Sequence, residues 1–297
     1  VHEDIKLGRP SRERYIENYK VTVERLAKAG VKTICYNFMP LFDWVRTDLH
    51  YPLEDGSTAM YLDREQVDRM DPRELVATIT ADPKFSMPGW EPERLSRLAP
   101  LFAAYEGVTA DDLREHLRYF LQQIIPVAER CGIRMALHPD DPPWPVFGLP
   151  RIACTRDDLA RILALHDSPH HGLTLCSGSL GARRDQDVAA MVREFAGRIP
   201  FAHIRNVRVF DNGSLVETSH RTADGTVDIA AVVQAYCETG FTGYVRPDHG
   251  RQVWDEACRP GYGLYDRAMG VMYLWGLWDA GQRCLQNGKN VKEEPAQ

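Results

Sequence analysis

Apolar residues recur at helical spacing along the chain, and each such stretch is followed by a short β-prone run. In the first stretch, residues 11–29, the apolar positions are Tyr15, Ile16, Tyr19, Val23, Leu26 and Ala27. Gly30 ends this pattern, and residues 31–38 are short and rich in β-forming side chains. The spacing therefore predicts a helix followed by a strand.

The same unit of helix and strand recurs four more times. The predicted helices cover residues 111–130, 156–166, 185–196 and 228–238. The strands after them cover residues 133–138, 173–176, 201–206 and 243–247. A last helix is predicted over 266–280. Strands that alternate with helices form a parallel sheet with both faces covered, so we predict an α/β fold.

The count of strands falls short of a closed barrel. Five strands are predicted, and Val1-His2-Glu3-Asp4 is interpreted as the end of a sixth. A complete TIM (β/α)8 barrel has eight parallel strands. The sheet is therefore either open or part of a barrel whose first two to three strands are missing. The chain does not begin with Met, which favours the second interpretation.

Two stretches interrupt the alternation. Residues 40–110 are rich in Pro, Asp, Arg and aromatic side chains, and short helices are predicted there over 64–70, 72–80 and 91–103. We interpret this stretch as a helical insertion that serves as a lid or an oligomer contact. Residues 207–218 predict a small hairpin around Asn212-Gly213. A single catalytic domain is assigned to residues 1–281 and a polar tail to 282–297.

Composition and charge narrow the class of protein. The chain has 297 residues, with 36 Lys+Arg against 42 Asp+Glu, for a net charge of −6. An acidic surface disfavours nucleic acid as a partner. No apolar run is long enough for a membrane span, and we expect no signal peptide. The seven cysteines are an odd, scattered set, which is typical of a reduced cytoplasmic protein.

Metal-binding side chain types stand at the ends of four successive predicted strands. They are His138, Cys176, His203 and Asp248. The carboxyl ends of parallel strands meet at one edge, where active sites of α/β folds form. A single His or Cys is more often a core residue than a ligand, but four in phase predict a divalent site. Thiolate and imidazole favour Zn, Fe or Mn over Ca or Mg.

The remaining polar candidates lie close to those strand ends. His249 directly follows Asp248 and is interpreted as an acid/base or as a residue that orients a ligand. Asn37 ends its own strand and is predicted to contact the substrate. Arg46 or Arg205 could clamp a substrate carboxylate, with a surface salt bridge as the alternative. The other six cysteines are interpreted as packing residues.

Several strings in the chain resemble those of the mannonate dehydratase family. The strings are Cys35-Tyr36-Asn37-Phe38-Met39-Pro40, Phe42-Asp43-Trp44, Arg46-Thr47-Asp48, His138-Pro139-Asp140-Asp141-Pro142-Pro143, Leu175-Cys176-Ser177-Gly178-Ser179, His203-Ile204-Arg205-Asn206, Arg246-Pro247-Asp248-His249-Gly250 and Pro260-Gly261-Tyr262-Gly263-Leu264-Tyr265. They span Val1 to about Gly281. The resemblance implies a xylose-isomerase-like TIM barrel and a metal-dependent hydro-lyase of glucuronate catabolism, which converts D-mannonate to 2-keto-3-deoxy-D-gluconate.

The resemblance also implies roles for individual residues. It implies that His138, Cys176, His203 and Asp248 are the metal ligands, and these are the same four residues that their positions at the strand ends predict. The usual metal of the family is Mn²⁺, with Fe²⁺ as the alternative. The resemblance also makes His249 and Tyr262 the acid and the base, but it does not assign the two roles. Members of the family carry about two further strands, and most of a third, before Val1.

Competing functions are left open by the sequence. A metal-dependent sugar isomerase or epimerase on the same barrel would release no water. A non-catalytic metalloprotein could use the same four ligands in a closed structural site. A DNA-repair endonuclease is disfavoured by the acidic balance. The insertion and the aromatic last helix indicate a homo-oligomer, a dimer or larger.

Overall fold

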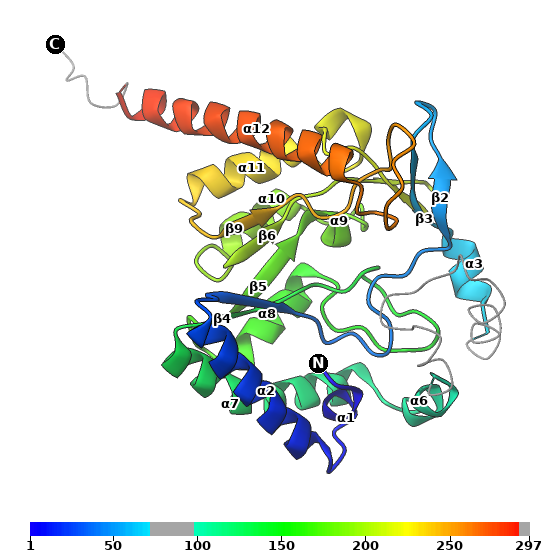
Figure 1. Ribbon diagram of the computed structural model, residues 1–297, viewed down its shortest axis with the longest axis vertical. Coiled ribbons are helices and arrows are strands. Elements are labelled where there is room, and N and C mark those ends of the chain that lie inside the picture. Colours follow the sequence, from blue (N-terminus) through cyan, green and yellow to red (C-terminus); the bar gives the residue numbers. More distant parts are fainter. Residues whose placement is uncertain (72–97, 291–297) are drawn as a thin grey trace.

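A parallel sheet of five strands forms the centre of the molecule (Figure 1). The computed structural model describes residues 1–71 and 98–290. In spatial order the strands are β1 (Thr33–Tyr36), β4 (Arg134–Leu137), β5 (His171–Cys176), β6 (Phe201–His203) and β9 (Tyr244–Arg246). The spatial order is also the chain order, as in the sheet of a (β/α)8 barrel. This arrangement confirms the predicted α/β class, as a half-barrel sheet.

Helices connect and cover these strands. Those that alternate with the strands of this sheet are α2 (Arg12–Lys28), α7 (Ala110–Cys131), α8 (Arg156–Ala164), α10 (Val188–Glu194), α11 (Ile229–Glu238) and α12 (Leu264–Asn290). The short ones are α1 (Glu3–Lys6), α3 (Arg64–Arg69), α6 (Leu98–Ala104), α9 (Ser177–Leu180) and a 3₁₀ turn at Thr222–Asp224. Helix α2 packs on α7, and α11 packs between α10 and α12.

Helix α7 shows how local sequence sets these elements. Thr109 caps its first turn and exchanges hydrogen bonds with Asp112 in a capping box, which satisfies backbone N–H groups that the helix leaves free. Gly132 ends it in the left-handed conformation that glycine adopts without steric cost. Between them, Leu113, Leu117 and Phe120 lie on the buried face. The predicted helix is therefore confirmed almost to the residue.

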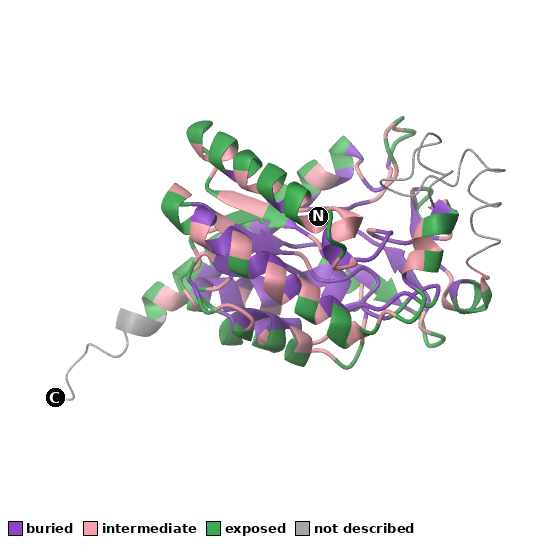
Figure 2. Cartoon of the chain, turned by 90° about the horizontal axis from the view of Figure 1, so that it is seen from below, coloured by how far each residue is buried: buried purple, intermediate pink, exposed green. Residues whose placement is uncertain are grey.

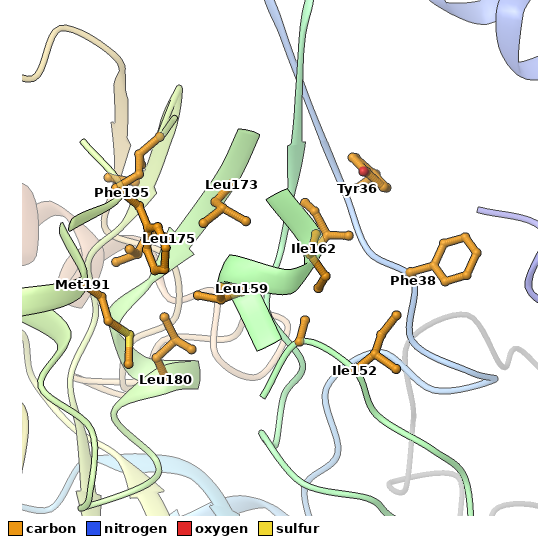
Figure 3. Packing of buried hydrophobic residues seen from close by; sticks show 14 of the residues in the cluster. Tyr36, Phe38, Ile152, Leu159, Ile162, Leu173, Leu175, Leu180, Met191 and Phe195 are labelled. Atoms are coloured by element: carbon orange, nitrogen blue, oxygen red, sulfur yellow. The ribbon is translucent and has the colours of Figure 1, made fainter. Parts of the chain in front are cut away.

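The core lies between the sheet and its helices (Figure 2). Every residue of β5 is buried, as expected for the middle strand of a parallel sheet. Leu173 and Leu175 of this strand lie among side chains of the neighbouring helices, including Leu159 of α8 and Met191 of α10 (Figure 3). This rigid centre supports the carboxyl ends of the strands.

A second, antiparallel sheet stands beside the first. Its order is β2 (Asp48–Pro52), β3 (Thr58–Leu62), β8 (Leu215–Glu217) and β7 (Val207–Val209). The hairpin predicted at 207–218 is confirmed as β7 and β8. The insertion predicted as helical over 40–110 also contains the strands β2 and β3, which were not predicted, and β3 pairs with β8. Of its predicted helices, 64–70 is confirmed and 72–80 lies outside the described residues, as does 91–103 up to residue 97.

The two ends of the chain also differ from expectation. The interpretation of Val1–Asp4 as a strand end is wrong, because Glu3–Lys6 form a helical turn that His2 caps. The last helix passes the predicted end at 280 and continues to Asn290, into the stretch assigned to the tail. None of the helices in the described part of the chain combines the length and the hydropathy that crossing a membrane requires.

Candidate metal and catalytic site

The carboxyl ends of four strands bring together the predicted metal ligands. His138 follows β4, Cys176 and His203 end β5 and β6, and Asp248 lies two residues beyond β9. The register pairs Cys176 with His203 and His203 with Arg246, so these ends lie at one level of the sheet. One potential ligand atom from each of the four residues lies within 4.8 Å of the others. The structure thus assembles the cluster that strand phase predicted.

The ionisation of the cluster suits a metal ion. Burial alone would raise the pKa of the Cys176 thiol, but Arg205 and His138 hold that pKa well below its usual range. Burial also opposes ionisation of Asp248, yet His249, His203 and Arg205 keep its pKa well below the ordinary value. The Cys176 thiolate and the Asp248 carboxylate are therefore both anionic, and they lie beside the imidazoles of His138 and His203.

His203 gives an independent sign that a metal ion fits here. Its ring is buried, and neither ring nitrogen has a hydrogen-bond partner. Nδ1 lies 3.6 Å from Asp248 Oδ2. Buried polar atoms without partners are uncommon in native proteins, and coordination of a cation would remove the deficit. The mixed thiolate, imidazole and carboxylate set favours a transition metal over Ca²⁺ or Mg²⁺.

A buried layer of charges supports the cluster. Arg205 Nε donates to Asp248 Oδ2 at 3.0 Å, and its Nη atoms donate to Glu217 Oε2 at 2.8 Å and Asp141 Oδ2 at 2.5 Å. Arg46 donates to Asp141 Oδ1 at 2.8 Å and Glu217 Oε1 at 2.6 Å. Three carboxylates and the Cys176 thiolate thus face two guanidinium groups. Burial would lower the pKa of His138, but the Cys176 thiolate raises it to about 10, so a bound metal would have to displace that proton. With both imidazoles then neutral, a divalent cation would balance this excess of two negative charges.

This layer changes the role expected of Arg46 and Arg205. Both side chains are buried, and their guanidinium groups are bonded to carboxylates of the protein itself. Neither residue lines the cavity above the cluster. These ion pairs are buried, so the surface salt bridge considered as the alternative is wrong, while contact of either arginine with a substrate stays a prediction. Both arginines hold the carboxylates around the cluster in place.

His249 and Tyr262 meet beside the ligands. His249 Nε2 lies 3.3 Å from the Tyr262 hydroxyl, and its Nδ1 lies 3.3 Å from Glu217 Oε1. Burial would raise the pKa of Glu217, but Arg205 and Arg46 hold it at about 2. Because Glu217 is an acceptor only, this contact orients the His249 ring with an Nδ1–H toward the carboxylate and Nε2 toward Tyr262.

A cavity of about 220 Å³ opens above these groups, and we call it the strand-end cavity. Its lining residues are Cys35, Tyr36, Asn37, Asp43, Trp44, His138, Asp141, His203, Arg246, Asp248, His249 and Tyr262. Asn37, predicted to contact substrate, is among them. Arg246 was not selected from the sequence, although it stands two residues before Asp248. Glu217 carried no sequence signal, since it follows Leu215-Val216 in an ordinary hairpin.

Comparison with known proteins gives consistent results. The family model described as D-mannonate dehydratase (UxuA) matches residues 1–288. Mannonate dehydratase 1 of Halalkalibacterium halodurans is 64% identical over 293 residues, which cover 99% of this chain and 80% of that protein. Mannonate dehydratase of Bacillus subtilis is 54% identical over 94% of this chain and 78% of its own length. The crystal structure of mannonate dehydratase from Streptococcus suis serotype 2 superposes with a TM-score of 0.85 at 40% identity, over 96% of this chain and 76% of that one.

Proposed function

The chain belongs to the mannonate dehydratase family, and we propose that it removes water from D-mannonate to form 2-keto-3-deoxy-D-gluconate. The observation that carries this proposal is a cluster of four metal-binding side chains, three of which line the same cavity as the His249–Tyr262 pair. The reaction takes a proton from C2, next to a carboxylate, and expels the hydroxyl group of C3. It needs charge stabilisation, a base and an acid, and each has a candidate here.

The proposed metal ligands are His138, Cys176, His203 and Asp248. A divalent cation bound to them would act as a Lewis acid that stabilises negative charge developing on the substrate carboxylate. We propose Mn²⁺, with Fe²⁺ as the alternative. The chain's own contribution is to keep the thiolate and the carboxylate ionised, through Arg205.

We assign the base to His249 and the acid to Tyr262. With Nδ1 held by Glu217, His249 presents the Nε2 lone pair to accept the C2 proton. Burial and Asp248 raise the pKa of the Tyr262 hydroxyl, so this hydroxyl carries its proton at neutral pH. It can deliver that proton to the departing oxygen of C3. The neighbouring Nε2 can afterwards return a proton to Tyr262.

Two further proposals concern the assembly of the protein and its cellular location. We propose a homo-oligomer, because Met272 and Trp275 of α12 are 70% and 61% exposed, and large apolar side chains at a surface are often contact residues. All seven cysteines are free, which supports a reducing compartment such as the cytoplasm. Sedimentation of the purified protein would test the first point.

The function is tested by incubating the purified protein with Mn²⁺ and D-mannonate and following the 2-keto acid. We expect product that depends on the metal and disappears after chelation. Parallel analysis of the sugar by NMR separates dehydration from isomerisation or epimerisation, which release no water. Metal-loaded protein that forms an isomer or epimer, or that leaves D-mannonate unchanged, would contradict the proposal.

A further inference from the structure

One arginine in the strand-end cavity has no committed partner. Arg246 is the one Lys or Arg residue among the described residues that line this cavity. Its side chain is 38% exposed, and the nearest carboxylate oxygen, Asp248 Oδ1, lies 3.5 Å from Nη2. This separation is longer than a normal charged hydrogen bond. Arg46 and Arg205, by contrast, are buried and ion-paired with carboxylates of the protein, which leaves Arg246 as the cation available to an anionic ligand.

The backbone of Arg246 is firmly placed. It is the last residue of β9, its Cα is in register with that of His203, and its carbonyl accepts the backbone N–H of Ile204 at 2.9 Å. The base of the side chain is therefore tied to the sheet beside the ligand cluster. The guanidinium carbon lies 5.8 Å from the centre of the Tyr262 ring. Arg246 thus stands at the rim between Asp248 and the proposed acid.

The chemistry of the substrate class matches this placement. An aldonate differs from a neutral sugar or polyol by one carboxylate, and C2, the proposed site of proton removal, is bonded to it. A guanidinium group offers paired N–H donors that fit the two carboxylate oxygens. We propose that Arg246 binds the carboxylate of the sugar acid and thereby selects aldonates over neutral polyols. This inference rests on the proposed function and names the residue that recognises its substrate.

A purely structural role for Arg246 would leave a different signature. If Arg246 served only to hold Asp248, its loss would weaken metal binding and would affect charged and neutral ligands alike. If Arg246 binds the carboxylate, its loss would weaken the charged ligand alone, with the metal retained. A pair of ligands that differ in the carboxylate therefore separates the two roles.

The experiment uses the Mn²⁺-loaded protein and three variants: Arg246→Gln, Arg246→Lys and Arg259→Gln. Arg259 is the matched control, because its guanidinium carbon lies 5.1 Å from the same Tyr262 ring while the residue lies outside the lining of the cavity. Calorimetric titration with D-gluconate and with uncharged D-glucitol measures the contribution of the carboxylate. Metal analysis and the KM for D-mannonate accompany each variant.

We expect the wild-type protein to bind D-gluconate more tightly than D-glucitol. Arg246→Gln should lose at least roughly 10-fold in affinity for D-gluconate and raise the KM for D-mannonate by a similar factor, as is typical of hydrogen bonds to charged groups. Its D-glucitol affinity and metal content should stay unchanged. Arg246→Lys should fall between wild type and Gln, because it keeps the charge without the paired donors, and Arg259→Gln should stay near wild type.

Three results would overturn the inference. They are equal wild-type affinity for D-gluconate and D-glucitol, unchanged D-gluconate affinity in Arg246→Gln, and a parallel loss of metal and of both ligands. Failure of the proposed function looks different, because the wild-type protein itself would then form no keto acid whatever the titrations give.

Discussion

Two cavities of this protein differ in size and in chemistry. The larger, about 640 Å³, lies between the antiparallel sheet and α12, and we call it the sheet–helix cavity. Arginines in its lining are bonded within the protein: Arg251 Nη2 lies 2.8 Å from Asp266 Oδ1, and Arg208 Nη2 donates to the carbonyl oxygen of Asp224 at 3.0 Å. The strand-end cavity has about a third of that volume, yet side chains from four strands converge on it. Convergence of reactive groups, more than volume, therefore marks the candidate site.

The difference has a topological cause. Parallel strands in register deliver their last residues to one edge, so side chains far apart in sequence meet there. The sheet–helix cavity forms where turns and strand edges meet a helix, and polar residues in such places bond to their neighbours. The strand-end cavity therefore keeps polar groups that lack partners within the protein. Most charged groups of the sheet–helix cavity bond to neighbouring residues.

Replacing Cys176 by Ser should have the largest effect on metal binding and turnover among the substitutions considered for the two cavities. Loss of the thiolate removes the soft ligand of the cluster, and we expect metal affinity to fall at least roughly 100-fold and turnover to disappear with it. Metal analysis and keto-acid formation provide the measurement. Cys284→Ser, at an exposed cysteine of α12, is the control and should match wild type. Normal metal content in Cys176→Ser would exclude the thiol as a ligand.

His249→Asn separates catalysis from metal binding in the same cavity. We expect turnover to fall by roughly 10²–10⁴, the usual contribution of a general acid or base, while the metal content stays normal. Tyr262→Phe should act in the same direction, because it removes the hydroxyl that faces Nε2. His50→Asn is a suitable control at an exposed histidine. Near-normal turnover of His249→Asn would remove this residue from the chemistry.

Glu217→Gln tests the buried charges beneath the strand-end cavity. The substitution leaves Arg46 and Arg205 with fewer anionic partners, and breaking a buried pair costs roughly 3–5 kcal/mol of unfolding free energy. Chemical denaturation measures the loss. Glu194→Gln, which breaks the surface pair with Arg156, should lose far less because water screens that pair. Equal losses of unfolding free energy in the two variants would contradict the expectation that the buried ion pairs contribute more than the surface pair.

Acid pH should weaken the protein in two stages. Burial lowers the pKa of His171 to about 4, so the unfolded chain takes up this proton first and stability falls as the pH drops from 6.5 toward 4. Glu217, with its pKa held at about 2, stabilises the fold above pH 4.5 and loses that contribution as the pH falls through 2. Denaturant titrations at stepped pH should show both stages in wild type. In Glu217→Gln the second stage should shrink, and an unchanged profile would contradict this assignment.

The smallest effect is expected from the sheet–helix cavity. Tyr273→Phe removes a hydroxyl that accepts the backbone N–H of Thr222 at 3.2 Å, a change worth about 1 kcal/mol of unfolding free energy. Because Tyr273 does not line the strand-end cavity, we expect kcat/KM for D-mannonate to change by no more than about twofold, or about 0.4 kcal/mol. Steady-state kinetics provide the check. A loss of turnover comparable to that of His249→Asn would mean that the larger cavity takes part in the reaction.

Local pattern was enough to predict most of the architecture. The periods of apolar residues, the caps and the glycine stops predicted the alternating helices and all five parallel strands, because these signals depend on a few neighbouring residues. Strand phase also pointed to the ligand cluster, since the end of a predicted strand is itself a local feature. His138, Cys176, His203 and Asp248 could therefore be selected from the sequence alone.

What the sequence left undecided depends on partners distant in the chain. β2 and β3 escaped prediction because β3 finds its partner in β8, where Tyr61 pairs with Val216. Arg46 and Arg205 were expected at a substrate, and only the fold shows that Asp141 and Glu217 reach their guanidinium groups first. Short-range periodicity determines which elements form. Long-range contacts decide which charges neutralise one another and which, like Arg246, remain free for a ligand.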